Sequence, residues 1–374
     1  MINVTKTFFP PLTEYNAQLE RIWKNEWLTN RGELLLELEK KLKNNLNVSD
    51  ILIMNNGTIP IQIALKLLAK KGEVITTPFS YVATTSSILW EGCTPVFVDI
   101  HPEYLTIDET KIEAAITDKT TCILATHVFG NPCNIDAITM IAQKHNLKVI
   151  YDAAHCFGVQ YKGKSIFQYG DVSTCSFHAT KLFHTGEGGA LFTKDKDLMH
   201  KCFYSHNFGH DGPLAFHGLG INGKISELQA AMGLSILPYM ELILAERKKV
   251  VDFYLNHLGI KSKNLKFHQH SKDALAHYAK DAYDIEYNFP FGWGEVEGIH
   301  NRTDFDLKQH ENLSGKNMTY FDTKTQEKYH PYIIETSTGL NRLFLMVLCE
   351  AYFEDTDNNR VVLRLPYDLA PIKA

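Results

Sequence analysis

The sequence predicts an α/β fold: a mostly parallel sheet covered by helices, followed by a smaller region of antiparallel strands. From about residue 50 to residue 195, short β-branched runs alternate with helical patterns, which is typical of a parallel sheet with helices on both faces. Beyond about residue 255 this alternation stops, and aromatic and histidine residues become dense. We therefore expect two domains, residues 1–255 and 256–374, with the boundary near residues 248–258.

Each expected element follows from its local pattern. Apolar and β-branched runs predict parallel-sheet strands at 51–54, 74–77, 94–98, 121–125, 148–151 and 190–193. Apolar residues spaced three and four apart predict helices at 59–68, 81–90, 108–115, 135–145 and 225–245. In the last third, alternating patterns predict antiparallel strands at 282–288, 293–299, 332–335 and 361–365. A functional site should lie where the carboxyl ends of the parallel strands meet.

Composition limits the classes of protein. The formal net charge of -5 gives no basic surface for nucleic acids or membranes. The seven cysteines are scattered without a C-x-x-C pair, which argues against a disulfide framework and a zinc site, and we expect no metal. The first ten residues lack the apolar core of a signal peptide, and no apolar run approaches the roughly 20 residues of a membrane span. We therefore expect a soluble, cytoplasmic protein.

A carboxylate and a lysine stand out within the first domain. The apolar strand at 149–155 delivers Asp152 at its carboxyl end, and Lys181 follows among small polar residues. This order suits pyridoxal phosphate, because an amine bonds to its aldehyde and a carboxylate keeps its pyridine nitrogen protonated. Each residue alone has an ordinary interpretation, Asp152 as a loop cap and Lys181 as a surface charge. Their order along one α/β pattern favours the cofactor.

Other strand ends carry groups that suit the same cofactor. Gly57 and Thr58 open a helix whose N–H groups and dipole form a phosphate cradle, although a simple helix cap is the alternative. Tyr81 would lie on the face of the pyridine ring or pack in the core. Ser176 would suit a phosphate oxygen. His178, which precedes the lysine, is either a catalytic group or a core histidine with its hydrogen bonds satisfied.

With these residues in place, residues 1 to about 250 resemble the large domain of the DegT/StrS family of nucleotide-sugar aminotransferases. That family has the aspartate-aminotransferase fold, type I of the pyridoxal-phosphate-dependent transferases. The resemblance implies that Lys181 forms the Schiff base, that Asp152 pairs with the pyridine nitrogen and that Tyr81 stacks on the ring. The matching stretches are WLTN (27–30), NGT (56–58), PFSYVATTSSILWEGCTPVFVDI (78–100), YDAAHCFG (151–158), SFHATKLFHTGEGG (176–189) and GINGKISELQAAMG (220–233).

The resemblance also implies phosphate contacts from Gly57, Thr58 and Ser176. Asn222 matches a family asparagine that reaches the phosphate of the neighbouring subunit, which implies a homodimer with shared active sites. The implied reaction moves an amino group from glutamate to a keto group of a dTDP- or UDP-linked deoxyhexose, for cell-surface polysaccharide biosynthesis. Lys181 would move protons at the reacting carbon.

Residues from about 256 to 374 instead resemble the C-terminal part of the catalytic core of a glycyl-tRNA synthetase, a class II antiparallel-sheet fold. The alternating pattern places Glu335 and Ser337 on one strand face, and a guanidinium such as that of Arg342 suits an ATP phosphate. An exposed strand face is the alternative for the two glutamates near residue 296. The resemblance implies a glycine and ATP pocket made by Glu295, Glu297, Arg302, Glu335, Ser337 and Arg342.

The synthetase motifs that should precede this segment, and the anticodon-binding domain that should follow it, are missing from the sequence. We therefore expect an exposed sheet edge, an unfilled core and no tRNA binding. Three functions stay open. The first is an aminotransferase whose C-terminal domain has been replaced. The second is a synthetase fragment that binds glycine and ATP with Mg²⁺. The third is a non-functional chimera.

Overall fold

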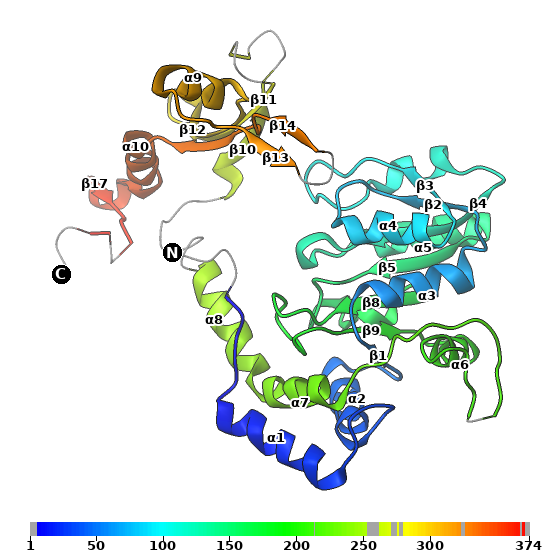
Figure 1. Cartoon of the computed structure of the whole chain (residues 1–374). Coiled ribbons are helices and arrows are strands. Elements are labelled where there is room, and N and C mark those ends of the chain that lie inside the picture. Colours follow the sequence, from blue (N-terminus) through cyan, green and yellow to red (C-terminus); the bar gives the residue numbers. More distant parts are fainter. Residues whose placement is uncertain are drawn as a thin grey trace. The chain divides into compact units, whose positions relative to one another are not determined.

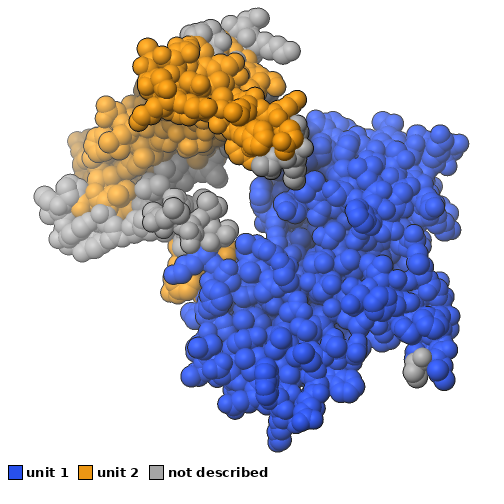
Figure 2. Space-filling view, in the orientation of Figure 1, with its two compact units in different colours: residues 1–244 blue, residues 245–374 orange. Residues whose placement is uncertain are grey.

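The structure, a computed structural model, describes residues 6–212, 214–252, 262–270, 275–276, 280–322, 326–366 and 369–370. The chain divides into two compact units, Met1–Leu244 and Ala245–Ala374, which have different colours in Figure 2. The division falls just before the expected boundary region, of which residues 253–261 lie outside the described residues. We call the two parts unit 1 and unit 2.

Unit 1 contains a seven-stranded sheet in the order β1-β9-β8-β5-β4-β2-β3 (Figure 1). Only β9 runs against its neighbours, so the sheet is mostly parallel, as predicted. A short hairpin, β6 (Gln160–Tyr161) and β7 (Lys164–Ser165), lies outside it. The strands of the sheet are β1 (Leu52–Met54), β2 (Glu73–Thr76), β3 (Thr94–Phe97), β4 (Thr120–Thr126), β5 (Lys148–Asp152), β8 (Val172–Ser176) and β9 (Gly189–Phe192).

Strand β8 was not predicted, because Val-Ser-Thr-Cys-Ser carries one aliphatic residue and resembles a polar loop. Its place between β5 and β9 buries these small side chains on both faces, so tertiary pairing overrides the weak local pattern. The predicted helix at 108–115 is also wrong, since the structure has two 3₁₀ turns there, Glu109–Lys111 and Glu113–Ala115. The side chain of Asp108 accepts a hydrogen bond from the backbone N–H of Thr110 and begins the first turn.

Helices cover both faces of this sheet. Alternate residues of one strand belong to different cores: Ile53 of β1 lies in one buried cluster, whereas Leu52 and Met54 lie in the other. Buried residues of α3, α4 and α6 belong to the cluster of Leu52, and those of α1, α2, α5 and α7 to the cluster of Ile53. The helices are α1 (Leu12–Asn25), α2 (Glu33–Leu46), α3 (Thr58–Leu68), α4 (Val82–Trp90), α5 (Ile135–His145), α6 (Lys196–Ser205) and α7 (Glu227–Ile236).

The helical pattern predicted at 225–245 is divided in the structure. Helix α7 passes through a 3₁₀ turn, Leu237–Tyr239, into α8 (Met240–Asp252). Pro238 lies in that turn, and its missing N–H interrupts the helical ladder. The stretch Glu227–Lys249 is long and apolar enough to cross a membrane, by length and composition alone, and 44% of its apolar window is buried in the structure. The cytoplasmic location stays a prediction.

Unit 2 has a four-stranded antiparallel sheet in the order β10-β11-β12-β15. The segments predicted at 282–288 and 293–299 lie within β11 and β12, whereas those at 332–335 and 361–365 overlap β15 and β17 only in part. The described buried core of unit 2 holds four residues. Several large apolar side chains are exposed, among them Phe344 with 64% of its surface. The elements are β10 (Leu265–Gln269), β11 (Asp281–Phe289), β12 (Gly292–Asn301), α9 (Phe305–Ser314), β13 (Tyr320–Asp322), β14 (Glu327–Tyr329), β15 (Ile334–Thr338), α10 (Leu340–Ala351), β16 (Tyr352–Asp355) and β17 (Arg360–Leu363).

Candidate functional site

A cavity of about 520 Å³ opens at the carboxyl ends of the parallel strands of unit 1. Strand β5 ends at Asp152, β8 ends at Ser176, and the turn after β1 begins α3. The parallel arrangement therefore collects at one edge groups that are far apart in the sequence. Seven of the residues predicted for the first domain line this cavity: Gly57, Thr58, Tyr81, Asp152, Ser176, His178 and Lys181.

Two hydrogen bonds fix the Asp152 carboxylate. Its side chain is 6% exposed, and it accepts hydrogen bonds from the Thr84 hydroxyl at 2.7 Å and from the Ala154 N–H at 3.2 Å. The half-buried Lys181 follows β8 in the loop that leads to β9. Burial lowers the pKa of the Lys181 amine, and the charge of Asp152 acts in the opposite direction. The two predicted groups therefore share one cavity and interact electrostatically.

The turn before α3 packs closely against the end of β8. A Cβ atom on Gly57 would lie 2.8 Å from the Cβ of Ser176, so only glycine fits here. The side chain of Asn56 accepts hydrogen bonds at 2.9 Å from the N–H groups of both Thr58 and Ile59. Those two helix N–H groups are thus already capped, in agreement with the alternative interpretation of this turn. The Thr58 side chain and the backbone at Gly57 still line the cavity.

Two predicted side chains lie at the open side of the cavity. Tyr81 immediately precedes α4 and is 78% exposed, so it is not a core residue. His178 is exposed as well, which excludes the buried-core interpretation. Its Nδ1 lies 2.9 Å from the Thr180 hydroxyl, and its Nε2 lies 3.6 Å from a carboxylate oxygen of Glu187. The ring is therefore oriented from both sides.

Asn222 is exposed and is not among the described residues that line the cavity. It forms an antiparallel bridge with Asn207, and its backbone carbonyl accepts a 3.4 Å hydrogen bond from the side chain of Asn55. Asn55 directly precedes the turn at Gly57. The structure therefore brings the backbone of Asn222 near this turn, while its side chain has no assigned contact with the cavity.

Sequence reasoning missed several lining residues. His155 lies in the quoted motif YDAAHCFG but was not singled out, and its pKa is lowered first by burial and then by the charge of Lys181. Phe129 has a positive φ of 55°, and no sequence pattern predicted this backbone conformation. The other lining residues that were not predicted are Asn56, Ile61, Ala83, Thr126, His127, Ala154, Thr180 and Glu187.

In unit 2, three of the six predicted pocket residues line one cavity of about 450 Å³: Glu295, Ser337 and Arg342. An Arg342 guanidinium nitrogen donates to the Glu295 carbonyl at 2.8 Å and lies 3.4 Å from its carboxylate. Arg302 is not among the described lining residues of this cavity and donates to the Glu335 carboxylate at 2.8 Å.

Glu297, the sixth predicted pocket residue, lies in β12 opposite Thr338 of β15. It too is absent from the described lining of the unit 2 cavity. Elsewhere in the described chain, two groups of side chains could hold a metal ion: His200, Asp211 and His217, and His268, Asp284 and Glu286. Ion pairs already join members of both groups, and the expectation of no metal stays a prediction.

Comparisons with known proteins match most of this chain. A sequence profile of the DegT/DnrJ/EryC1/StrS aminotransferase family matches residues 12–287, past the expected domain boundary at residue 255. The dTDP-4-amino-4,6-dideoxy-D-glucose transaminase of Shigella dysenteriae is 48% identical over 253 residues, which cover 68% of this chain and 69% of that protein. A crystal structure of DesI with its TDP-sugar product has 31% identity and a TM-score of 0.66, covering 76% of this chain and 72% of DesI.

A second kind of relative is a tRNA ligase. The glycine–tRNA ligase of Treponema denticola is 54% identical over 122 residues, which cover 30% of this chain but only 27% of the ligase. Both resemblances inferred from the sequence are thereby confirmed. The predicted reaction class, a nucleotide-sugar aminotransferase that uses pyridoxal phosphate, is confirmed as well. The chain belongs to the DegT/DnrJ/EryC1/StrS aminotransferase family.

Proposed function

We propose that the unit 1 cavity transfers an amino group from glutamate to a keto group of a dTDP- or UDP-linked deoxyhexose, in cell-surface polysaccharide biosynthesis. The observation that carries this proposal is that Asp152 and Lys181 line one cavity at the carboxyl ends of the sheet. The Shigella relative, which is named for dTDP-4-amino-4,6-dideoxy-D-glucose, supports a 4-keto-6-deoxy sugar as the acceptor.

The residues present fit pyridoxal phosphate. The turn at Gly57 packs too closely against Ser176 for any larger residue, and Thr58 and Ser176 both line the cavity beside this turn. These groups would hold the phosphate. Tyr81 would cover one face of the ring, and Asp152 would hold a proton on the ring nitrogen. When bound, the cofactor supplies an electron sink for the electrons released at the amine-bearing carbon.

The side chains of the chain then divide the work. The lowered pKa of Lys181 enlarges the neutral fraction of its amine, which is the form that bonds to a carbonyl and accepts a proton. The Thr84 hydroxyl keeps the Asp152 carboxylate aimed into the cavity. His178 is held between Thr180 and Glu187, and it would accept or donate protons beside Lys181.

A homodimer completes this proposal. Asn222 is exposed and lies outside the described lining of its own cavity, as expected for a residue that serves the phosphate of a partner. Glutamate and the nucleotide sugar would enter between the two subunits. We propose that residues 1–255 carry this site.

For residues 256–374 we propose a partial class II synthetase core. The match to glycine–tRNA ligase supports it, as does the cavity that contains Arg342 beside Glu295. Glycine and ATP with Mg²⁺ would bind there only if this part is functional. The separation of the Arg302–Glu335 pair from that cavity favours the aminotransferase as the activity of the whole chain. A chimera with neither activity is the remaining alternative.

The purified full chain tests these proposals. We expect a visible absorption band after addition of pyridoxal phosphate, and its loss on addition of glutamate. The band should be absent in Lys181→Ala and present in the control Lys119→Ala, which changes an exposed lysine outside the cavity. Glycine-dependent exchange of pyrophosphate into ATP, lost in Arg342→Ala, would favour the synthetase instead. Absence of both signals would leave the non-functional chimera.

A further inference from the structure

Two histidines and an aspartate meet on unit 1, outside the described lining of the candidate active site. His200 lies on α6, and Asp211 and His217 lie on the segment that follows this helix. Each side chain offers one ligand atom, and the three atoms all lie within 4.8 Å of one another. We call these residues the His-Asp-His cluster.

Both imidazole rings of the cluster turn the same nitrogen toward one carboxylate oxygen. The Nε2 atom of His217 lies 2.6 Å from Oδ2 of Asp211, and the Nε2 atom of His200 lies 3.6 Å from that oxygen. In a tetrahedral zinc site with bonds of about 2.0 to 2.2 Å, ligand atoms lie about 3.3 Å from one another. The two distances in the cluster lie on either side of this value. Small rotations of the side chains would therefore complete three zinc bonds.

The cluster is open to solvent, so an ion can reach it. The exposed fractions of the side chains are 54% for His200, 38% for Asp211 and 47% for His217. The contact of His200 with the carboxylate is too long for a hydrogen bond, and exposed ion pairs contribute little to stability because water screens them. Replacing these contacts by bonds to a cation therefore costs little.

A tyrosine ring holds both histidines in position. Tyr204 lies one turn after His200 on α6. Its ring lies nearly parallel to that of His217, with ring centroids 5.4 Å apart and an interplanar angle of 24°. The same tyrosine meets the ring of His200 edge to face, with centroids 5.6 Å apart. Packing of this kind fixes ligand side chains before an ion binds.

Hydrogen bonds of the backbone fix the segment that carries the other two ligands. Its ends meet, because Asn207 forms an antiparallel bridge with Asn222. Between them, the N–H of Asp211 donates to a carbonyl at 3.0 Å and the N–H of His217 to another at 2.9 Å. Residue 213 of this segment lies outside the described residues, and Leu214 beside it is 93% exposed. A bond from the cluster to α6 would therefore hold the exposed part of the segment on the helix.

We propose that the His-Asp-His cluster binds one Zn²⁺ ion through Nε2 of His200, Nε2 of His217 and the carboxylate of Asp211, and that the ion fixes residues 207–222 on α6. Imidazole nitrogens favour zinc over magnesium. Any proton on either Nε2 passes to solvent when zinc binds, and a water molecule takes the fourth position. The expectation of no metal came from the cysteines, and this ligand set contains none. The proposal does not depend on the function proposed above.

Zinc titration of the purified full chain tests the site. The chain is treated with a chelator, dialysed and titrated with ZnCl₂ in a calorimeter, with and without an excess of Mg²⁺. Asp211→Asn, His200→Gln and His217→Gln should each remove one zinc equivalent or weaken its binding by more than about tenfold, the loss that follows even from removing a partner of a ligand. Mg²⁺ should not displace the ion.

The matched control is His210→Gln. His210 belongs to the same segment, but its ring packs on Phe216 and it is outside the cluster. This variant should retain the zinc equivalent. Near-ultraviolet circular dichroism of every variant identifies any that does not fold, and three separate ligand variants keep the test decisive if one of them fails.

Cleavage by chymotrypsin measures whether zinc holds the segment. Leu214, Phe216 and Leu219 are exposed sites for this protease, and cleavage requires the segment to leave α6. With zinc at ten times its dissociation constant, cleavage at these sites should slow about tenfold in the unchanged chain and in His210→Gln. Asp211→Asn should show no such protection. Mass spectrometry of the fragments identifies the sites that are cut.

Three results would overturn the proposal. The first is that the unchanged chain binds no zinc. The second is that all three ligand variants keep every zinc equivalent, which would assign the ion to other side chains such as the group that contains His268. The third is that zinc leaves cleavage of the segment unchanged, which would make the ion an adventitious surface ligand.

Discussion

Unit 1 and unit 2 differ most in how many buried, hydrogen-bonded residues hold their candidate sites in place. In unit 1, both faces of the sheet are covered by buried clusters, and Asp152 is nearly fully buried and held by two hydrogen bonds. In unit 2, the described core cluster holds Tyr287, Phe289, Val296 and Met346 alone, and the side chain of Arg342 is mostly exposed. A site is preorganised only when packed residues fix its side chains. This difference favours unit 1 as the part with chemistry.

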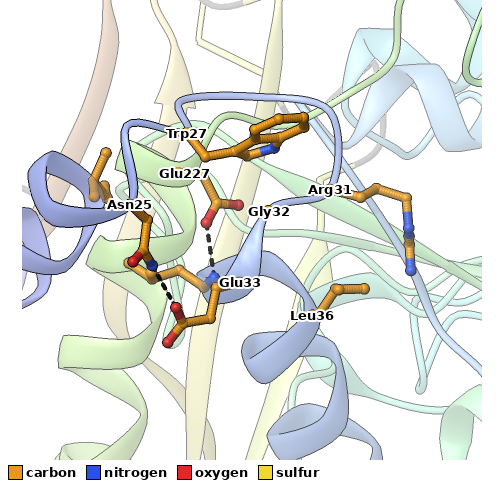
Figure 3. A pocket seen from close by; sticks show the side chains of 9 residues that line it. Asn25, Trp27, Arg31, Gly32, Glu33, Leu36 and Glu227 are labelled. Carbon is orange, nitrogen blue, oxygen red and sulfur yellow. Dashed lines mark hydrogen bonds between the residues drawn. The ribbon is translucent and has the colours of Figure 1, made fainter.

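One helix of unit 1 is capped by a side chain from a distant segment. In unit 1, the Glu227 carboxylate of α7 reaches the first turn of α2 and accepts the N–H groups of Leu34 at 2.7 Å and Leu35 at 3.2 Å. Figure 3 shows this carboxylate between the ring of Trp27 and the start of α2. In unit 2, α10 begins at Gly339 without a side-chain cap. Distant segments therefore support each other in unit 1, where the cap joins residues 193 positions apart.

The largest expected effect compares the two cores directly. Phe192 of β9 is 1% exposed and stacks on Phe167 at 4.2 Å, so Phe192→Ala should lower the free energy of unfolding of unit 1 by about 3 to 5 kcal/mol. Phe344→Ala in α10 of unit 2 should change it by less than about 0.5 kcal/mol, because that ring is already exposed. Urea denaturation followed by hydrogen exchange in each unit measures both. Equal losses of free energy of unfolding in Phe192→Ala and Phe344→Ala would mean that the two cores are packed equally well.

The next effect concerns the cap on α2. Glu227→Ala should lower the free energy of unfolding of unit 1 by about 3 kcal/mol, because two buried N–H groups lose a charged acceptor. Glu33→Ala, which removes an exposed carboxylate from the first turn of the same helix, is the control. We expect no measurable change for that control in the same denaturation assay. If Glu227→Ala lowered the free energy of unfolding no more than Glu33→Ala does, the contact between Glu227 and α2 would not stabilise unit 1.

A pH dependence distinguishes unit 1 further. Burial lowers the pKa of His127 to about 3, whereas the unfolded side chain titrates near about 6.5. Between these values the unfolded state binds more protons, so the free energy of unfolding falls as the pH is lowered through this window and is unaffected above it. The slope from one such proton is about 1.4 kcal/mol per pH unit. The measurement is a series of denaturation curves between pH 4 and pH 8.

His127→Asn should reduce that slope without removing the local hydrogen bond, because the amide oxygen replaces Nδ1 as the acceptor of the Cys133 N–H. Burial also lowers the pKa of His206, to about 4, so part of the slope should remain. A slope that His127→Asn leaves intact would contradict the assignment.

The smallest effect is expected in the unit 2 cavity. Arg342 and Glu295 are both substantially exposed, and water screens their 3.4 Å ion pair. Arg342→Ala should therefore change the free energy of unfolding of unit 2 by less than about 0.5 kcal/mol. Calorimetry of the full chain, with the unit 2 transition resolved, gives the value. A loss above about 1 kcal/mol would indicate a preorganised pocket and narrow the difference between the units.

Much of unit 1 could be predicted because its signals are local. Apolar runs such as Ile53 and its neighbours define strands by their own composition, and the rule for parallel strand ends then places Asp152 at the site without further knowledge. Strand β8 escaped prediction for the opposite reason: its small polar residues form a strand only because β5 and β9 lie on either side. Unit 2 shows the same limit, since strands formed at or beside the predicted segments while only three of the six expected pocket residues line one cavity.

The sequence by itself determined the alternation of strands and helices in much of unit 1, the prediction that a strand-end aspartate and a lysine share one site, and the change of character after residue 255. Only the tertiary structure decided that Glu227 caps α2, that Phe129 turns toward His155, and that Arg302 joins Glu335 rather than the cavity of Arg342. Strand and helix patterns depend on residues that are neighbours in the sequence. The direction and partner of a side chain depend on segments far away in the chain, and they are settled only when those segments pack.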